Sequence, residues 1–339
     1  MTFAEEFIQM VNRWNSLPKE IYDDELSIQL LQDEIDLIKT PPLKYPPKHA
    51  YFSPSSSDSM QRELVVKVRK FPKDPIVKQP YTKRWQDAGT FYGGYIQRIV
   101  MFCEKHYPAQ FGEESPFYFE RIYLKEHDRE FPSFETAIKK SVGYEYRNHK
   151  IYIFGQGDGI LIHRATGTRI ILEVKSKQTS YSATGHFSMK EATGSHVKQV
   201  IAYSLHHQEE DKPINHGILF YGNLAKKSWT MTEEDVEKYP DIRTFDIEIN
   251  EEKQVALLDH FADVLDHVDA GTLPPIDLEK WMFCNFKEVI ADGLTDEEFA
   301  VVKETVKAIQ KTKLPDYKKN PYIDAFLYIK DRRTPNEDA

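Results

Sequence analysis

The segment GQGDGILIHRATGTRIILEVKSKQ, residues 155–178, decides the fold that the sequence predicts. Two apolar runs flank the turn-forming stretch 165–168, a pattern typical of two antiparallel strands joined in a hairpin. Because side chains alternate along a strand, Glu173 and Lys175 project from the same face of the second strand. An acid and a lysine inside an apolar strand make little sense as packing, since unpaired buried charge is costly.

The hairpin also predicts a second acid beside the first. If the turn centres on residues 166–167, Glu173 pairs with Ile160. Asp158 then lies diagonally across, on the same face, and such neighbours are about 7–8 Å apart. Two carboxylates at this separation can converge on one hard divalent cation, with Lys175 next to it. The alternative is a partly exposed edge strand that carries an ordinary Glu-Lys surface pair.

A helix after the hairpin adds polar side chains. In SHVKQVIAYS, residues 195–204, helical spacing places His196, Gln199 and Tyr203 on one face. An amide and a phenol can orient a water, a phosphate oxygen or the lysine. A cation and a lysine together favour hydroxide formation and counter the charge that grows on a phosphodiester under in-line attack.

Apolar periodicity and turn signals outline the rest of the chain. The stretch 1–40 is helical in pattern, whereas the proline-rich stretch that follows predicts a linker or an extended wrap. Helices are expected over 85–106, 195–207, 252–270 and 295–312, and strands over 117–124, 150–155, 159–163, 169–175, 216–221 and 242–249. Strands flanked by helices at both ends predict an α/β or α+β fold with a mixed sheet.

Composition narrows the class of protein. The chain has 339 residues, 40% of them hydrophobic, which is enough for a substantial core. It has two cysteines and neither a secretory-type apolar run nor a long uncharged span, so we expect a cytoplasmic protein without membrane association. A net charge of -9 argues against indiscriminate coating of nucleic acid.

Charge is unevenly distributed. Between residues 41 and 100, eleven Lys or Arg stand against four Asp or Glu, a local balance of +7. This segment is either a phosphate-facing wall or an ordinary solvated surface. Elsewhere, His206 and His207 are expected at an exposed helix end, where cations suit the helix dipole.

Three motifs in one order resemble the RecB-type nucleases of the PD-(D/E)xK superfamily. They are GxxD from Gly155 to Asp158, ExK from Glu173 to Lys175 and QxxxY from Gln199 to Tyr203. The resemblance to phage-encoded and CRISPR-associated relatives extends to YFSPSSSDSMQRELVVKVR, GTFYGGYIQRIV and LPPIDLEKWMFCNFKEV, and so covers roughly residues 50 to 290.

The resemblance implies a restriction-endonuclease-like PD-(D/E)xK core with flanking helices. Its boundaries would be a helical extension and linker over 1–48, the nuclease core over 49–290, and a C-terminal helix and tail over 291–339. The family cuts DNA with Mg²⁺ or Mn²⁺, frequently as an exonuclease, which for phage relatives means DNA replication, recombination or repair in the bacterial host cytoplasm.

The resemblance also assigns roles to residues. The metal would be held by Asp158, Glu173 and the backbone carbonyl of Val174, with Lys175 catalytic. Gln199 and Tyr203 would complete the catalytic set by arranging the site. Charge and position suggest these phosphate contacts: Arg62, Lys67, Arg69, Lys83 and Arg84.

Two departures from the family pattern follow. Relatives commonly place a metal-binding His where this chain has Gly93, so water, Gln97 or Glu104 would have to compensate. Relatives with an iron-sulfur cluster use four cysteines, whereas here Met60 stands at the first position and only Cys284 remains of the others. A four-cysteine cluster within one chain is thereby excluded, and Cys284 is expected to pack as a small apolar residue.

Two further functions remain open at this stage. One is a catalytically silent protein that binds DNA ends or junctions. The other is a nuclease subunit that works only inside a helicase or recombinase assembly, with replication or recombination proteins as partners. The oligomeric state is left open by the sequence.

Overall fold

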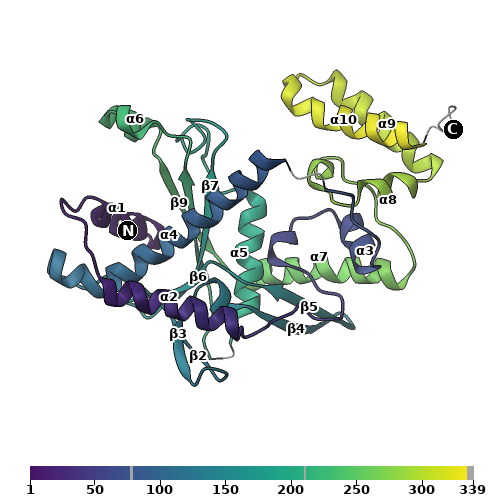
Figure 1. Cartoon of the computed structure of the whole chain (residues 1–339). Coiled ribbons are helices and arrows are strands. Elements are labelled where there is room, and N and C mark those ends of the chain that lie inside the picture. The colour runs from purple at the N-terminus through teal and green to yellow at the C-terminus, as the bar shows by residue number, and fades with distance from the viewer. Residues whose placement is uncertain (77–78, 210, 334–339) are drawn as a thin grey trace. The chain divides into compact units, whose positions relative to one another are not determined.

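The structure, a computed structural model, describes residues 1–76, 79–209 and 211–333 (Figure 1). The chain divides into two compact units. Unit 1 comprises Met1–Ser57, Lys78–Gly143 and Tyr152–Leu257, and unit 2 comprises Asp58–Val77, Tyr144–Ile151 and Leu258–Ala339. The boundaries expected at residues 48 and 290 stay a prediction, and the N-terminal helices share the core of the sheet in unit 1. Residues 334–339 of the expected tail lie outside the described residues.

A five-stranded mixed sheet organises unit 1. Its order is β1 (Phe117–Phe119), β6 (Gly159–His163), β7 (Arg169–Lys177), β8 (His216–Asn223) and β9 (Ile242–Glu248). The pairs β1-β6, β6-β7 and β8-β9 are antiparallel, and β7-β8 is parallel. The expected α/β class with a mixed sheet and flanking helices is confirmed.

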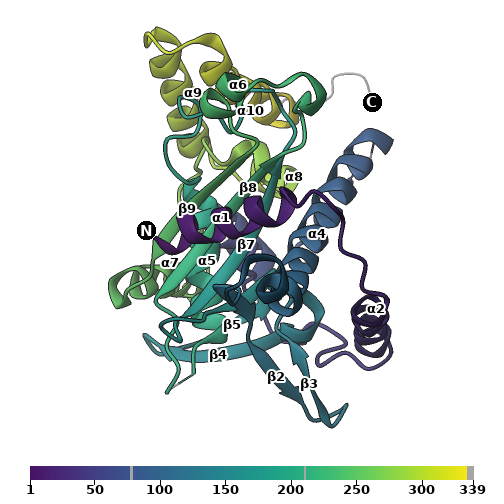
Figure 2. The same ribbon diagram turned by 90° about the vertical axis from the view of Figure 1, so that its left-hand side faces the viewer.

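The N-terminal helices cover one face of this sheet. Figure 2 shows α1 (Phe3–Asn15) crossing the strands, and the long helix α4 (Pro80–Phe111) packs into the same core. Alternate residues such as Leu172 and Phe220 point to this side, together with Phe7 of α1. The helix α2 (Asp24–Lys39) adds Leu26 and Leu30 to it.

Helix α5 (Gly194–His207) covers the opposite face. Val200 and Tyr203 pack there against the other alternate set of strand residues, including Ile171 and Leu219. Glu173 and Lys175 have the same parity as Ile171, so they also face α5. The site described below lies on this side of the sheet.

The two histidines at the end of α5 are buried, contrary to the expectation from the sequence. His206 is 0% exposed and His207 is 3% exposed, so they are not at an exposed helix end. The carbonyl of Lys140 accepts a hydrogen bond from His206 Nε2 at 2.7 Å, and the Tyr203 ring lies parallel to the His207 ring. The last turn of α5 is therefore covered by its neighbours in unit 1.

The predicted strand 117–124 is two strands. After β1 the chain turns at Glu120, and β2 (Arg121–Leu124) pairs with β3 (Arg129–Pro132) in a separate sheet. The remaining elements of this part of the chain are η1 (Pro54–Ser56), η2 (Glu135–Ile138), β4 (Lys140–Tyr146), β5 (His149–Gly155), η3 (Ser228–Thr230) and α6 (Glu233–Lys238). None of the helices within the described ranges combines the length and apolar character that crossing a membrane requires.

Unit 2 is built around an apolar cluster of helices. Its elements are α3 (Gln61–Val68), most of α7 (Glu251–Asp269), η4 (Trp281–Phe283), α8 (Lys287–Asp292), α9 (Asp296–Lys311) and α10 (Asp316–Arg333). Met60 and Cys284 are both buried in this cluster, beside Trp281 and Ile290. Cys284 thus packs as an apolar residue, as expected.

Gly222 lets α4 lie close to β8, because a Cβ there would overlap the ring of Tyr92. We expect Gly222→Ala to lower the free energy of unfolding by about 1–3 kcal/mol. In a double-mutant cycle measured by urea denaturation, Gly222→Ala should cost much less stability when Tyr92→Ala is also present, because the overlapping ring is gone. Gly94→Ala, at an open position of α4, is the control. Additive effects of Gly222→Ala and Tyr92→Ala would contradict this explanation.

Candidate active site

The register of the β6-β7 hairpin decides how the two acids meet. Ile160 lies opposite Ile171, and Gly159 lies opposite Leu172. The predicted pairing of Ile160 with Glu173 is therefore wrong by two residues, because the turn centres one residue earlier, where the Gly167 amide donates to the His163 carbonyl. A shift of two residues preserves the face. Continuing the register brings Asp158 directly opposite Glu173 rather than diagonal to it.

The turn that carries Asp158 is held from both faces of the sheet. Gln97 of α4 donates from Nε2 to the Asp158 carbonyl at 2.9 Å. Tyr203 of α5 donates its hydroxyl hydrogen to the Gln156 carbonyl at 2.6 Å. A Cβ at Gly157 would lie 3.5 Å from the Tyr203 ring, so the turn passes closely over that ring.

Glu173 is buried and only partly satisfied, whereas Asp158 is half-buried. Asp158 Oδ2 accepts a hydrogen bond from the Val174 amide at 2.6 Å. Glu173 is 3% exposed, and its Oε1 pairs with Lys175 Nζ at 2.5 Å. Its other oxygen, Oε2, is buried and has no hydrogen-bond partner among the described residues. A buried carboxylate oxygen without a partner costs free energy unless something else binds it.

Burial and mutual repulsion both oppose ionisation of the Asp158 and Glu173 carboxyl groups. Burial, followed by the charge of Asp158, raises the pKa of Glu173 to about 8. Burial likewise raises the pKa of Asp158. The nearby Glu135 has a raised pKa too, first from burial and then from Asp158. The site thus concentrates acids whose ionised forms need a cation.

Lys175 is fixed by the residues that the motif pattern singled out. Its Nζ donates to Gln199 Oε1 at 3.0 Å, in addition to the ion pair with Glu173. Gln199 Nε2 donates in turn to the Tyr203 hydroxyl at 3.4 Å. Glu173, Lys175, Gln199 and Tyr203 therefore lie together in unit 1. Gln199 bonds directly to the Lys175 amine, and Tyr203 bonds to Gln199.

The donor set suits a hard divalent ion. Within the described ranges, no cluster of three or more His, Cys, Asp and Glu side chains has a metal-binding arrangement. Two carboxylates on one face, one of them with an unpartnered oxygen, nevertheless match the oxygen ligands that Mg²⁺ and Mn²⁺ take alongside water and backbone carbonyls. Asp158, Glu173 and the carbonyl of Val174 therefore fit such an ion.

The position that lacks a histidine is open. No atom lies within 4 Å of a Cβ built at Gly93. Gln97, one helical turn later, is engaged with the Asp158 carbonyl, and Glu104 pairs with Arg121 at 2.6 Å. Of the two side chains expected to compensate, Gln97 holds the turn that carries Asp158. Glu104 pairs through Oε1, and its buried Oε2 has no hydrogen-bond partner among the described residues.

The expected phosphate contacts separate into two groups. Arg62 is 1% exposed, pairs with Glu298 and donates to the Pro274 carbonyl, so its expected contact with phosphate does not fit its burial. Arg69 caps the end of α7 by donating to the carbonyls of His267 and Thr272.

Three of these cations remain at the surface. Lys67 is half-buried, and burial is the main cause of its lowered pKa. Lys83 and Arg84 are exposed on the first turns of α4, where Lys83 pairs with Asp87. These two belong to unit 1, which also contains the acids.

Sequence reasoning missed parts of the site. Glu135 was not singled out, because it lies in a short 3-10 segment with no motif around it. Lys177 follows Lys175 on the same face of β7, a parity that the sequence already contained. Its ammonium lies 5.2 Å from the ring centre of Tyr221, whose hydroxyl bonds to His196 Nδ1 at 2.9 Å.

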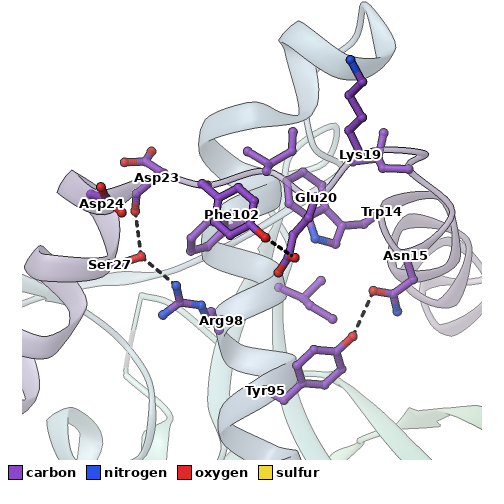
Figure 3. A pocket seen from close by; sticks show the side chains of 14 residues that line it. Trp14, Asn15, Lys19, Glu20, Asp23, Asp24, Ser27, Tyr95, Arg98 and Phe102 are labelled. Atoms are coloured by element: carbon purple, nitrogen blue, oxygen red, sulfur yellow. Dashed lines mark hydrogen bonds between the residues drawn. The ribbon is translucent and has the colours of Figure 1, made fainter.

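Several cavities are lined by residues of unit 1, and two of them have the same volume. One, of about 480 Å³, adjoins the site at the end of β7 and is lined by residues that include Lys177, Lys190 and Thr193. The other, also of about 480 Å³, lies among the loop after α1, the start of α2 and α4 (Figure 3). Tyr95 and Arg98 line it, but neither the two acids nor Lys175 does. Neither carboxylate lines the first cavity either, but its Lys177 lies two residues after Lys175 on the same face of β7.

Comparisons with protein-family models and with curated protein sequences find no match. Among solved structures, the chain is similar to an alkaline exonuclease, LHK-Exo, from Laribacter hongkongensis, with a TM-score of 0.35 and 9% identity over 65% of this chain and 89% of that one. The same values hold for LHK-Exo in complex with dAMP. A phage-related exonuclease from Haemophilus somnus 129PT has a TM-score of 0.36 and 11% identity, over 66% and 95% of the two chains. Similarity at this level carries no argument about activity, which has to come from the site itself.

Proposed function

We propose that the protein is a metal-dependent deoxyribonuclease that hydrolyses phosphodiester bonds, working as an exonuclease. One observation carries the proposal: a buried carboxylate, a half-buried one and a lysine meet on one face of the sheet, and Glu173 Oε2 has no partner among the described residues. Such a group makes a poor structural core and a suitable site for phosphodiester chemistry.

Each side chain has a distinct role in this proposal. Asp158, Glu173 and the carbonyl of Val174 would hold Mg²⁺ or Mn²⁺, and the bound ion would supply a lowered pKa for water and polarisation of the phosphate. Lys175 donates hydrogen bonds to the attacking water or to a phosphate oxygen, and its charge stabilises the transition state. Gln199 keeps the amine oriented through its bond to Nζ, and Tyr203 holds both Gln199 and the turn before Asp158.

The first candidates for phosphate contacts lie in unit 1. Lys177 and Lys190 line the cavity beside the site, where they would attract phosphates. Lys83 and Arg84 on α4 are further candidates, and Lys67 and Arg69 are retained as candidates in unit 2. Arg62 is left out because it is buried.

The direct test is degradation of end-labelled DNA in Mg²⁺ and in Mn²⁺. We expect nucleotide release from linear DNA, no cleavage of circular DNA, and loss of activity in Asp158→Asn and Glu173→Gln. Cleavage of circles would replace the exonuclease assignment with an endonuclease. Tight DNA binding with no saturable Mn²⁺ binding would support the catalytically silent alternative and contradict the proposal.

The open position in α4 allows a gain-of-affinity prediction. Gly93 lies one turn before Gln97, so a side chain at 93 projects from the same side of the helix. We expect Gly93→His to tighten Mn²⁺ binding about tenfold by adding an imidazole ligand, measured by calorimetric titration. Gly94→His is the matched control, since position 94 is equally open but points elsewhere. Equal effects of the two substitutions would contradict the proposed position of the ion.

A further inference from the structure

One side of α2 carries an exposed apolar row. Ile28, Leu31, Ile35 and Ile38 are 66%, 57%, 43% and 69% exposed. They recur at intervals of three, four and three residues, which is the spacing of the a and d positions of a coiled coil. Isolated exposed aliphatic residues are common, but a continuous row along a helix is typical of an interaction surface.

The other side of α2 already has its partners. Leu26 and Leu37 are buried, Leu30 packs on the core of unit 1, and Asp33 pairs with Arg129 at 2.7 Å. The exposed row lies about 150° around the helix from these residues. It therefore points away from the packed core, and α2 is seen nearly end-on in Figure 2.

We infer that the exposed row of α2 docks against α2 of a second copy of this chain. The inference does not depend on the proposed nuclease activity. It rests on the charges beside the row, because Glu25 and Lys39 occupy flanking positions on one side and Glu34 on the other. All three side chains are exposed.

These charges make a favourable contact with an identical helix in either orientation, and the parallel orientation suits them better. In a parallel pair, Glu34 of each copy lies beside Lys39 of the second copy, and no like charges oppose each other. In an antiparallel pair, Ile28 packs on Ile38 of the second copy and Glu25 lies beside Lys39 of the second copy, whereas Glu34 lies beside Glu34 of the second copy. Lys39 makes the favourable contact in both arrangements.

The acidic character of α2 disfavours binding of nucleic acid to its exposed row. Lys39 is its single basic residue, against these acids: Asp24, Glu25, Asp33, Glu34 and Asp36. Phosphates would be repelled from such a surface. The helix has 16 residues and so is about 24 Å long, room for the four apolar layers and little more. Since this is smaller than a standard interface, we expect a weak dimer in the micromolar range.

Sedimentation equilibrium of the full chain tests the inference. We expect a monomer-dimer equilibrium whose dimer disappears in Leu31→Glu and in Ile35→Glu. Melting temperatures should stay unchanged, since both side chains are exposed in the monomer. Val301→Glu, on an exposed position of α9, is the control that should leave the equilibrium unaltered. A chain that is monomeric at every concentration, or a dimer indifferent to the α2 variants, would overturn the inference.

A charge exchange separates self-association from docking of another protein. Lys39→Glu should weaken the dimer at least about tenfold. Adding Glu34→Lys restores it if the helices are parallel, and adding Glu25→Lys restores it if they are antiparallel. If neither second substitution restores association, the identical helix is not the occupant and the inference fails.

Discussion

Lys175→Met should lower the rate of DNA hydrolysis by about 10³-fold while leaving the protein folded and able to bind Mn²⁺. Methionine has nearly the same length as lysine, so the substitution removes the ammonium without opening a large cavity. The loss belongs to the chemical step, because Lys175 is proposed to stabilise charge that develops in the transition state. It should therefore appear in kcat rather than in KM.

Lys177→Met is the matched comparison for that experiment. Lys177 lies two residues later on the same face of β7, beside the cavity, and is proposed to attract phosphates. Its loss should raise KM and change kcat little. Single-turnover rates with saturating DNA distinguish the two variants. A Lys175→Met enzyme within tenfold of the wild-type kcat would contradict the catalytic role of the lysine.

Acid should destabilise the fold through the two buried histidines at the end of α5. Burial lowers the pKa of His206 to about 4 and lowers the pKa of His207 well below its usual value. The Lys140 carbonyl accepts from His206 Nε2, so His206 Nδ1 is left to accept from His207 Nε2 at 3.1 Å. Protonating His206 at Nδ1 would turn its N–H toward the N–H of His207 Nε2 and break this hydrogen bond.

The sign of the pH dependence follows from these pKa values. Between pH 6.5 and 4 the unfolded chain binds protons at these histidines that the folded chain does not, so stability falls as the pH falls. At pH 5 His206 should cost about 2 kcal/mol, a large share of a typical free energy of unfolding, and His207 acts in the same direction. Urea denaturation at pH 7.5 and pH 5 measures the change.

A variant of His206 separates its effect on the pH dependence of stability from that of the buried acids, whose raised pKa values act in the opposite direction. His206→Gln keeps a donor for the Lys140 carbonyl but does not titrate. Its loss of stability between pH 7.5 and pH 5 should be about 2 kcal/mol smaller than that of the wild type. His186→Gln, at an exposed position, should leave the pH dependence as it is. An unchanged pH dependence in His206→Gln would show that the ring is protonated at little cost.

The site illustrates how far residue patterns reach. Alternation along β7 placed Glu173 and Lys175 on one face without any coordinates, since parity depends only on the strand being a strand. The pairing register of β6 and β7 could not be predicted in the same way. The exact centre of their turn depends on hydrogen bonds such as that from the Gly167 amide to the His163 carbonyl. The predicted register was wrong by two residues, and the shared face survived because two is the period of a strand.

Residues without a local signal were the ones that sequence reasoning misplaced. Arg62 looked like a surface cation, and its burial against Glu298 joins two segments 236 residues apart. Helix α10 has a proline at position 321 and little apolar periodicity, so its pattern did not predict it. Glu135 enters the site only because the chain returns past Asp158.

The sequence by itself determined the mixed α/β class, the strand that carries the acid and the lysine, and the helical face of Gln199 and Tyr203. These depend on periodicities of two and of 3.6 residues, which neighbouring residues impose. Only the tertiary structure decided that Asp158 lies opposite Glu173, that Arg62 is buried, and that α2 keeps an apolar row exposed. Such features depend on which distant segments pack together, and local spacing does not encode that choice.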